Sequence, residues 1–114
     1  PFVSQEIIKS CIDGLDEYKA VVTSIPAIDT VIKVADNEVI NIEDRKHLFL
    51  NQTPQGFDYE TIMNAHKMDK RDVTDDISLL DLNQTKCKII QGSLQNIKIT
   101  TSEDIHTAKS ILNL

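Results

Sequence analysis

Residues 19–28 read KAVVTSIPAI, a short apolar run rich in β-branched side chains. Such a run predicts a strand buried in a sheet, and Pro26 should end it because proline cannot donate to a strand ladder. Upstream, Ser4 predicts the cap of a helix. Apolar residues then recur at helical spacing and predict one buried face, made of Ile7, Ile8, Cys11, Ile12 and Leu15.

Downstream, residues 29–45 predict a β-hairpin. Two β-prone runs, Thr30–Val34 and Glu38–Ile42, flank the turn-forming residues Ala35-Asp36-Asn37. A lone two-stranded ribbon is marginally stable in water. We therefore expect this ribbon to lie against another surface, and a second subunit is the hypothesis we carry forward.

The rest of the chain alternates between helical and strand-like segments. The stretch NQTPQGF (51–57) is interpreted as a conformationally restricted connection between the ribbon and the next helix. Next we expect a helix capped by Asp58 that carries Tyr59, Ile62, Met63 and His66, followed by a charged loop over 67–73. A short helix from Thr74 through Leu82 and two strands, over 86–91 and 97–99, should come after that loop. The final helix should be capped by Thr101 or Ser102, with a core face made of Ile105, Ala108, Ile111 and Leu112. This alternation favours a layered α/β fold.

Composition excludes several classes of function. The 114 residues include 18 acidic and 12 basic side chains, a net charge of −6, which lacks the cationic field of a nucleic-acid-binding protein. No apolar run approaches the roughly 20 residues that cross a bilayer, so we expect a cytoplasmic protein without a membrane partner. Cys11 and Cys87 should be reduced and mostly buried, and the three histidines match no metal-ligand motif.

The two ends of the predicted ribbon form the first candidate site. If the ribbon pairs through a tight turn, Thr30 and Arg45 come close together. They could then bind one anion through a hydroxyl and a guanidinium. The alternative is a surface pair between an aspartate of these ends and Arg45, without a ligand.

Three further positions carry suitable chemistry. Thr74, followed by Asp75 and Asp76, is either a helix cap or a hydroxyl and carboxylate presented to a polyol. Lys98 is either solvated or directed into a cleft, where it would neutralise phosphate charge. Pro54 favours extended geometry at Thr53 and so gives the Thr53 hydroxyl a defined direction.

Four ordered motifs connect these positions. The strings DTVIK, DRKHLFLNQTPQGF, TDD and NIKITTSED resemble the 2-C-methyl-D-erythritol 4-phosphate cytidylyltransferase family, and the resemblance covers essentially the whole chain. It implies the C-terminal half of a Rossmann-like nucleotidyltransferase sheet with a protruding β-hairpin dimerisation arm, residues 28–46. The opening PFVS is similar to the segment that follows the family's Asp-Ala-Ala-Arg motif.

The resemblance also implies a reaction and its residues. Family members join CTP to methylerythritol phosphate and release pyrophosphate. By resemblance, Thr30 and Arg45 hold the sugar phosphate from an arm that reaches a partner subunit, and Thr53 contacts the same phosphate. Thr74 would meet the hydroxyl end of the substrate. Lys98 and Arg45 would be the catalytic residues, with Lys98 stabilising charge on the phosphates.

Residues 1–114 are expected to be a partial domain. The family's CTP-binding half and its Mg²⁺-binding carboxylate belong to an N-terminal part that is missing here, so no metal ligand is assigned and we expect the 114 residues alone to be inactive. Two alternatives remain. One is a ribitol-5-phosphate cytidylyltransferase, which shares the QTPQ and NIK motifs. The other is a non-catalytic module for dimerisation or sugar-phosphate binding.

Overall fold

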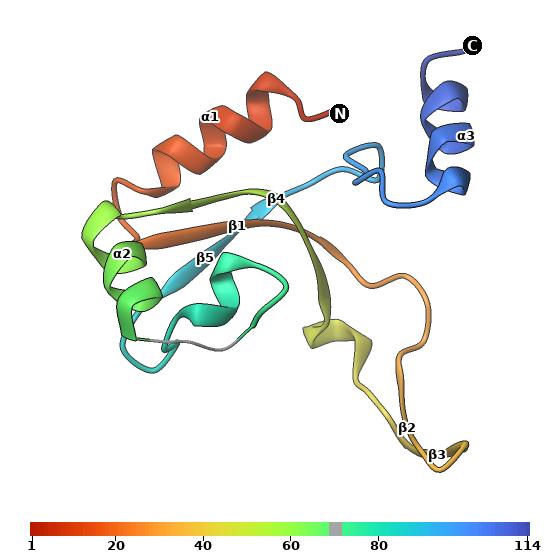
Figure 1. The fold of residues 1–114 in the computed structure, drawn as a ribbon, viewed down its shortest axis with the longest axis horizontal. Helices are drawn as coiled ribbons and strands as arrows, with labels where there is room; N and C mark the ends of the chain where they lie inside the picture. Colours follow the sequence, from red (N-terminus) through yellow and green to blue (C-terminus); the bar gives the residue numbers. More distant parts are fainter. Residues whose placement is uncertain (69–71) are drawn as a thin grey trace.

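The fold is built on a mixed three-stranded sheet. The computed structural model describes residues 1–68 and 72–114, and part of the charged loop predicted over 67–73 lies outside them. Strand β1 (Ala20–Pro26) is central, antiparallel to β4 (Phe49–Phe57) and parallel to β5 (Cys87–Gln91) (Figure 1). The predicted α/β class is confirmed, and the buried strand ends at Pro26 as expected.

Helix α1 (Gln5–Gly14) covers one face of this sheet (Figure 1). The Ser4 hydroxyl accepts a hydrogen bond from the Ile7 amide at 3.1 Å, so the predicted cap is confirmed. The core cluster joins helix and sheet and consists of Cys11, Val21 and Ile90, with Leu15 and Tyr18 packed against it. The predicted apolar face is only partly buried, however: Ile8 and Ile12 are 44% and 62% exposed.

Strand β4 corrects our interpretation of NQTPQGF. The whole stretch lies inside this strand, and it is not a connection. From the pair Val22–Gln55 to the pair Ser24–Asn51, β1 advances two residues while β4 advances four, so β4 bulges outward opposite Thr23. The buried Thr23 hydroxyl donates to the Pro54 carbonyl at 2.7 Å and fixes this bulge to the sheet. A bulge redirects side chains, and here it carries Thr53.

The predicted ribbon is confirmed as a separate two-stranded hairpin, β2 (Ile32–Ala35) and β3 (Glu38–Ile42). Asp36 and Asn37 adopt positive φ angles of 51° and 63°, as a tight hairpin turn requires. The hairpin extends away from the sheet (Figure 1). All nine of its strand residues are exposed, including apolar side chains at Ile32, Val34, Val39, Ile40 and Ile42.

The remaining elements differ more from expectation. Helix α2 (Tyr59–Met68) is present, but the helix expected from Thr74 is a single 3₁₀ turn, η2 (Asp76–Leu79), that starts after Asp75. No strand forms over 97–99, which is a loop in the structure. Helix α3 (Ser102–Ile111) is capped by Thr101, one of the two caps predicted, yet only Ala108 of its predicted core face is buried.

None of the helices in the described residues is long and apolar enough to cross a membrane. Cys11 is buried, Cys87 is half-buried, and both are free thiols, as expected.

Candidate active site

An open cavity of about 480 Å³ lies beside the β4 bulge. Three sequence-predicted residues line it: Thr53 from the bulge, Thr74 from the segment before η2, and Lys98 from the loop before α3. All three residues are exposed, so their side chains are accessible to a ligand. The fold thus brings together residues from three segments that are well separated in sequence.

The loop that carries Lys98 is bonded to the backbone of Thr53 through Asn96. The Asn96 side chain is only 7% exposed, and its amide donates to the Thr53 carbonyl at 2.6 Å. No hydrogen bond or ion pair joins the Lys98 ammonium to another residue within 1–68 and 72–114. Its charge is therefore available to an anion in the cavity.

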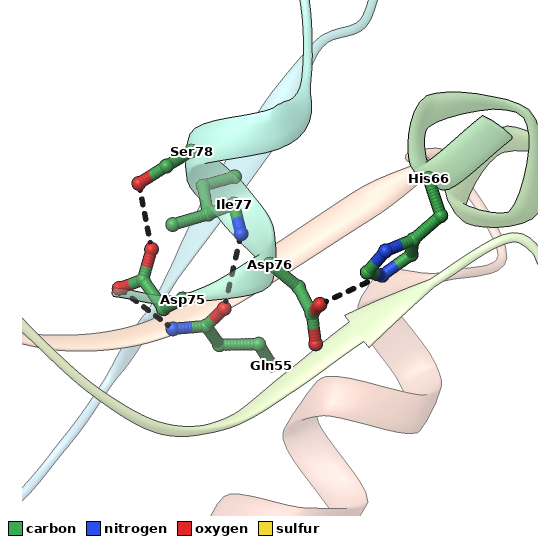
Figure 2. A network of polar contacts seen from close by, with 6 residues as sticks. All are labelled: Gln55, His66, Asp75, Asp76, Ile77 and Ser78. Atoms are coloured by element: carbon green, nitrogen blue, oxygen red, sulfur yellow. Dashed lines mark hydrogen bonds and ion pairs between the residues drawn. The ribbon is translucent and has the colours of Figure 1, made fainter. Parts of the chain in front are cut away.

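Asp75, which follows Thr74 in the chain, also lines the cavity, and its carboxylate contacts Ser78 and Gln55 (Figure 2). Burial alone would raise its pKa, but hydrogen bonds from Ser78, Asn51 and Gln55 outweigh burial and hold the pKa of Asp75 below its usual value. The carboxylate is therefore ionised at neutral pH. Thr74 does not cap a helix, so that alternative is wrong, and its hydroxyl remains a possible ligand group.

Asp104 also lines the cavity, but its carboxylate is used to begin α3. It accepts from the Thr100 and Thr101 amides, each at 2.8 Å, and from both hydroxyls at 3.0 Å. These bonds, the backbone ones first, lower the pKa of Asp104 to about 2. The residue therefore shapes the loop that follows Lys98 and does not present a free carboxylate.

Asp104→Asn should destabilise α3 at neutral pH and lose that effect in acid. A folded-state pKa below the unfolded one means that the carboxylate stabilises the fold above about pH 4, and that this stabilisation disappears as pH falls toward 2. The urea midpoint of unfolding, measured from the NMR signals of α3, should be higher for wild type than for the variant at pH 6. The difference should vanish near pH 2. A constant difference across this range would contradict the role. Glu103→Gln, also in the first turn, is the matched control.

Arg45 and Thr30 lie outside this cavity, at the root of the hairpin. The two ends of the hairpin do come close, because the Glu43 amide donates to the Val31 carbonyl at 2.9 Å and the Arg45 guanidinium donates to the Ile28 carbonyl. The alternative aspartate–Arg45 pair is wrong: within the described residues Arg45 forms no ion pair, and Asp44 pairs with His47 at 3.3 Å. Within the described residues, no hydrogen bond joins Thr30 to Arg45, so the structure does not bring them into one site.

The described residues do not fit a magnesium site. They bring together no group of three or more His, Cys, Asp or Glu side chains that could hold a metal ion. The two carboxylates in the cavity, Asp75 and Asp104, are already engaged in several hydrogen bonds each.

Sequence reasoning missed the amide side chains that build the cavity wall, namely Asn51, Gln52, Gln55 and Asn96. For Asn51, Gln52 and Gln55 the signal was the density of amides around Thr53-Pro54, and Asn96 lies far from that stretch in the sequence.

The fold is that of an α/β protein with a mixed sheet and a projecting hairpin. The cavity beside the β4 bulge gives it a site of small-molecule size. The family model described as 2-C-methyl-D-erythritol 4-phosphate cytidylyltransferase matches residues 1–114. The chain belongs to this family.

Individual relatives agree with the family match. The chain is 44% identical over 112 residues to the 2-C-methyl-D-erythritol 4-phosphate cytidylyltransferase of Prochlorococcus marinus strain MIT 9215, covering 94% of this chain and 50% of that protein. The chain is also 35% identical to a Bacillus thuringiensis protein of the same name, and this match covers all of the chain and 52% of that protein. The chain thus spans about half the length of the curated relatives it matches.

A solved structure gives the same picture of the fold. The 4-diphosphocytidyl-2C-methyl-D-erythritol synthase of Anaerococcus prevotii superposes with a TM-score of 0.87 at 35% identity, covering all of this chain and 55% of that one.

Proposed function

We propose that residues 1–114 are part of a CTP-dependent cytidylyltransferase that converts 2-C-methyl-D-erythritol 4-phosphate to its CDP derivative. The observation that carries this proposal is the single cavity lined by Thr53, Thr74 and Lys98, together with the family membership. In this reaction a phosphate oxygen of the sugar phosphate forms a bond to the α-phosphorus of CTP. The bond from that phosphorus to the bridging oxygen breaks, and pyrophosphate leaves.

Each cavity residue suits one part of this reaction. The Lys98 ammonium stabilises negative charge that develops on the phosphates, since a fixed cation in a partly enclosed site costs no reorganisation. The Thr53 hydroxyl, held by the bulge, donates to the acceptor phosphate. Thr74, beside the ionised Asp75, faces the polyol end, where a hydroxyl and a carboxylate pair well with alcohol groups.

The hairpin is proposed as a dimerisation arm. Its apolar side chains are uncovered within the described chain, and a two-stranded ribbon of this kind needs a surface to lie on. In this proposal the arm places Arg45 and Thr30 against the partner subunit, where they hold the acceptor phosphate. That arrangement explains why neither residue lines the cavity of its own protomer.

The CTP-binding half and the Mg²⁺ ligands are proposed to lie outside residues 1–114, and the enzyme to act in the cytoplasm.

The decisive experiment is a substrate panel. The polypeptide with its N-terminal half should release pyrophosphate from CTP with methylerythritol phosphate and much more slowly with ribitol 5-phosphate. The reverse preference would favour the ribitol enzyme, and turnover of neither would favour a non-catalytic module. Residues 1–114 alone should release none, and turnover by them would contradict the proposed division of the site.

A further inference from the structure

The amides on either side of Thr53-Pro54 are joined to two separate loops of the cavity. Gln52 contacts the loop that leads to Lys98, and Gln55 contacts the segment that carries Thr74 and Asp75. Thr53 lies between the two glutamines, so one strand holds both sides of the cavity.

Gln52 bonds to Ser93 as a peptide group would. Its side-chain nitrogen donates to the Ser93 carbonyl at 2.8 Å, and its side-chain oxygen accepts from the Ser93 amide at 3.3 Å. A Cβ at the preceding residue, Gly92, would lie 2.2 Å from the Gln52 Oε1 and 3.1 Å from the Ser24 carbonyl oxygen, so a larger residue there would displace the Gln52 side chain from Ser93. The loop is thus fixed at Ser93 by Gln52, and again at Asn96, two residues before Lys98, by the Thr53 carbonyl.

Gln55 holds the opposite side of the cavity in the same way (Figure 2). Its side-chain oxygen accepts from the Ile77 amide at 3.3 Å, and its side-chain nitrogen lies 3.4 Å from the Asp75 carboxylate. A third bond, also 3.4 Å, runs from that nitrogen to the Gln52 carbonyl and links the two anchors.

We infer that Gln52 and Gln55 are positioning residues with separable effects: Gln52 sets the place of Lys98, and Gln55 sets the place of Thr74 and Asp75. Both glutamines are half-buried and their polar atoms are used on these loops, so neither acts as the ligand-binding group itself. The inference rests on the proposed function, because the two loops matter to the reaction only if the cavity binds the substrates.

Two matched variants in the complete enzyme test this. Gln52→Met keeps the side-chain length but removes both bonds, and it should speed hydrogen exchange at the Ser93 amide about tenfold, as expected for losing roughly 1.4 kcal/mol. It should lower kcat about tenfold with little change in KM. Gln55→Met should speed exchange at Ile77 and raise KM for the sugar phosphate while leaving KM for CTP unchanged. Gln95→Met is the control, since the Gln95 side chain is exposed and bonds to no described residue.

A charged substitution gives a second test of the role of Gln55. Gln55→Glu retains an acceptor for Ile77 but sets a carboxylate against Asp75, so exchange at Ile77 should rise further. Adding Asp75→Asn reverses the original bond, because the new amide at position 75 donates to the new carboxylate at position 55. The double variant should return hydrogen exchange at Ile77 toward the wild-type rate. Amides of α1 report whether each variant is folded.

The outcomes separate the two proposals. Unchanged exchange at Ser93 and Ile77, or equal changes of kcat and KM in both variants, overturns the inference while an active wild type leaves the proposed function standing. An inactive wild type overturns the proposed function and with it the inference.

Discussion

Lys98→Met in the complete enzyme should reduce kcat by about 10²- to 10³-fold, the loss typical of removing one preorganised group that stabilises transition-state charge. The ammonium lines the cavity and is paired with no described residue, so its interaction is available to the reacting phosphates. KM for CTP and for the sugar phosphate should change much less, because the charge that Lys98 meets grows in the transition state.

Steady-state pyrophosphate release measures this directly. Lys109→Met is the matched control, since Lys109 is an exposed lysine in the last turn of α3 and does not line the cavity. An equal loss in both variants would point to general destabilisation. A Lys98 variant that changes only KM would show that the residue binds substrate and does not act on the chemical step.

Elements with strong local signals were predictable from sequence. The cap and apolar spacing of α1, the β-branched run of β1 and the turn at Asp36-Asn37 each depend on interactions within a few residues. Strand β4 was not predicted because Pro54 and Gly56 are ordinarily strand breakers, whereas here a bulge opposite Thr23 accommodates Pro54, and Gly56 pairs regularly with Val21. The short alternation over 97–99 predicted a strand, but Asn96 bonds to Thr53 and holds this segment as a loop.

The candidate site, too, was predictable only in part from the sequence. Thr53, Thr74 and Lys98 could be named from ordered motifs, yet no local pattern places them in one cavity. The amides that do so have distant partners: Gln52 reaches 41 residues to Ser93, and Gln55 reaches 20 residues to Asp75. Such pairings depend on the β4 bulge, which itself depends on the Thr23 hydroxyl of a neighbouring strand. Side-chain amides carry no sequence signal that identifies their partners.

Arg45→Ala should raise KM for the sugar phosphate about 10- to 100-fold and leave KM for CTP nearly unchanged. The range corresponds to the roughly 1.5–3 kcal/mol of a hydrogen bond to a charged group. Arg45 also donates to the Ile28 carbonyl at the hairpin root, so a merely structural role has to be separated from phosphate binding. A purely structural role would loosen the hairpin and weaken the binding of both substrates, or the proposed dimer, together.

Three measurements make that separation. Lys46→Ala removes a neighbouring exposed cation and should leave both KM values unchanged, which excludes a general effect of charge. Light scattering of Arg45→Ala should show an unaltered oligomeric state. Arg45→Lys keeps the charge but loses the planar fork, so it should recover only part of the affinity. Equal increases in KM for CTP and sugar phosphate would remove Arg45 from the phosphate site and leave it as the residue that closes the arm.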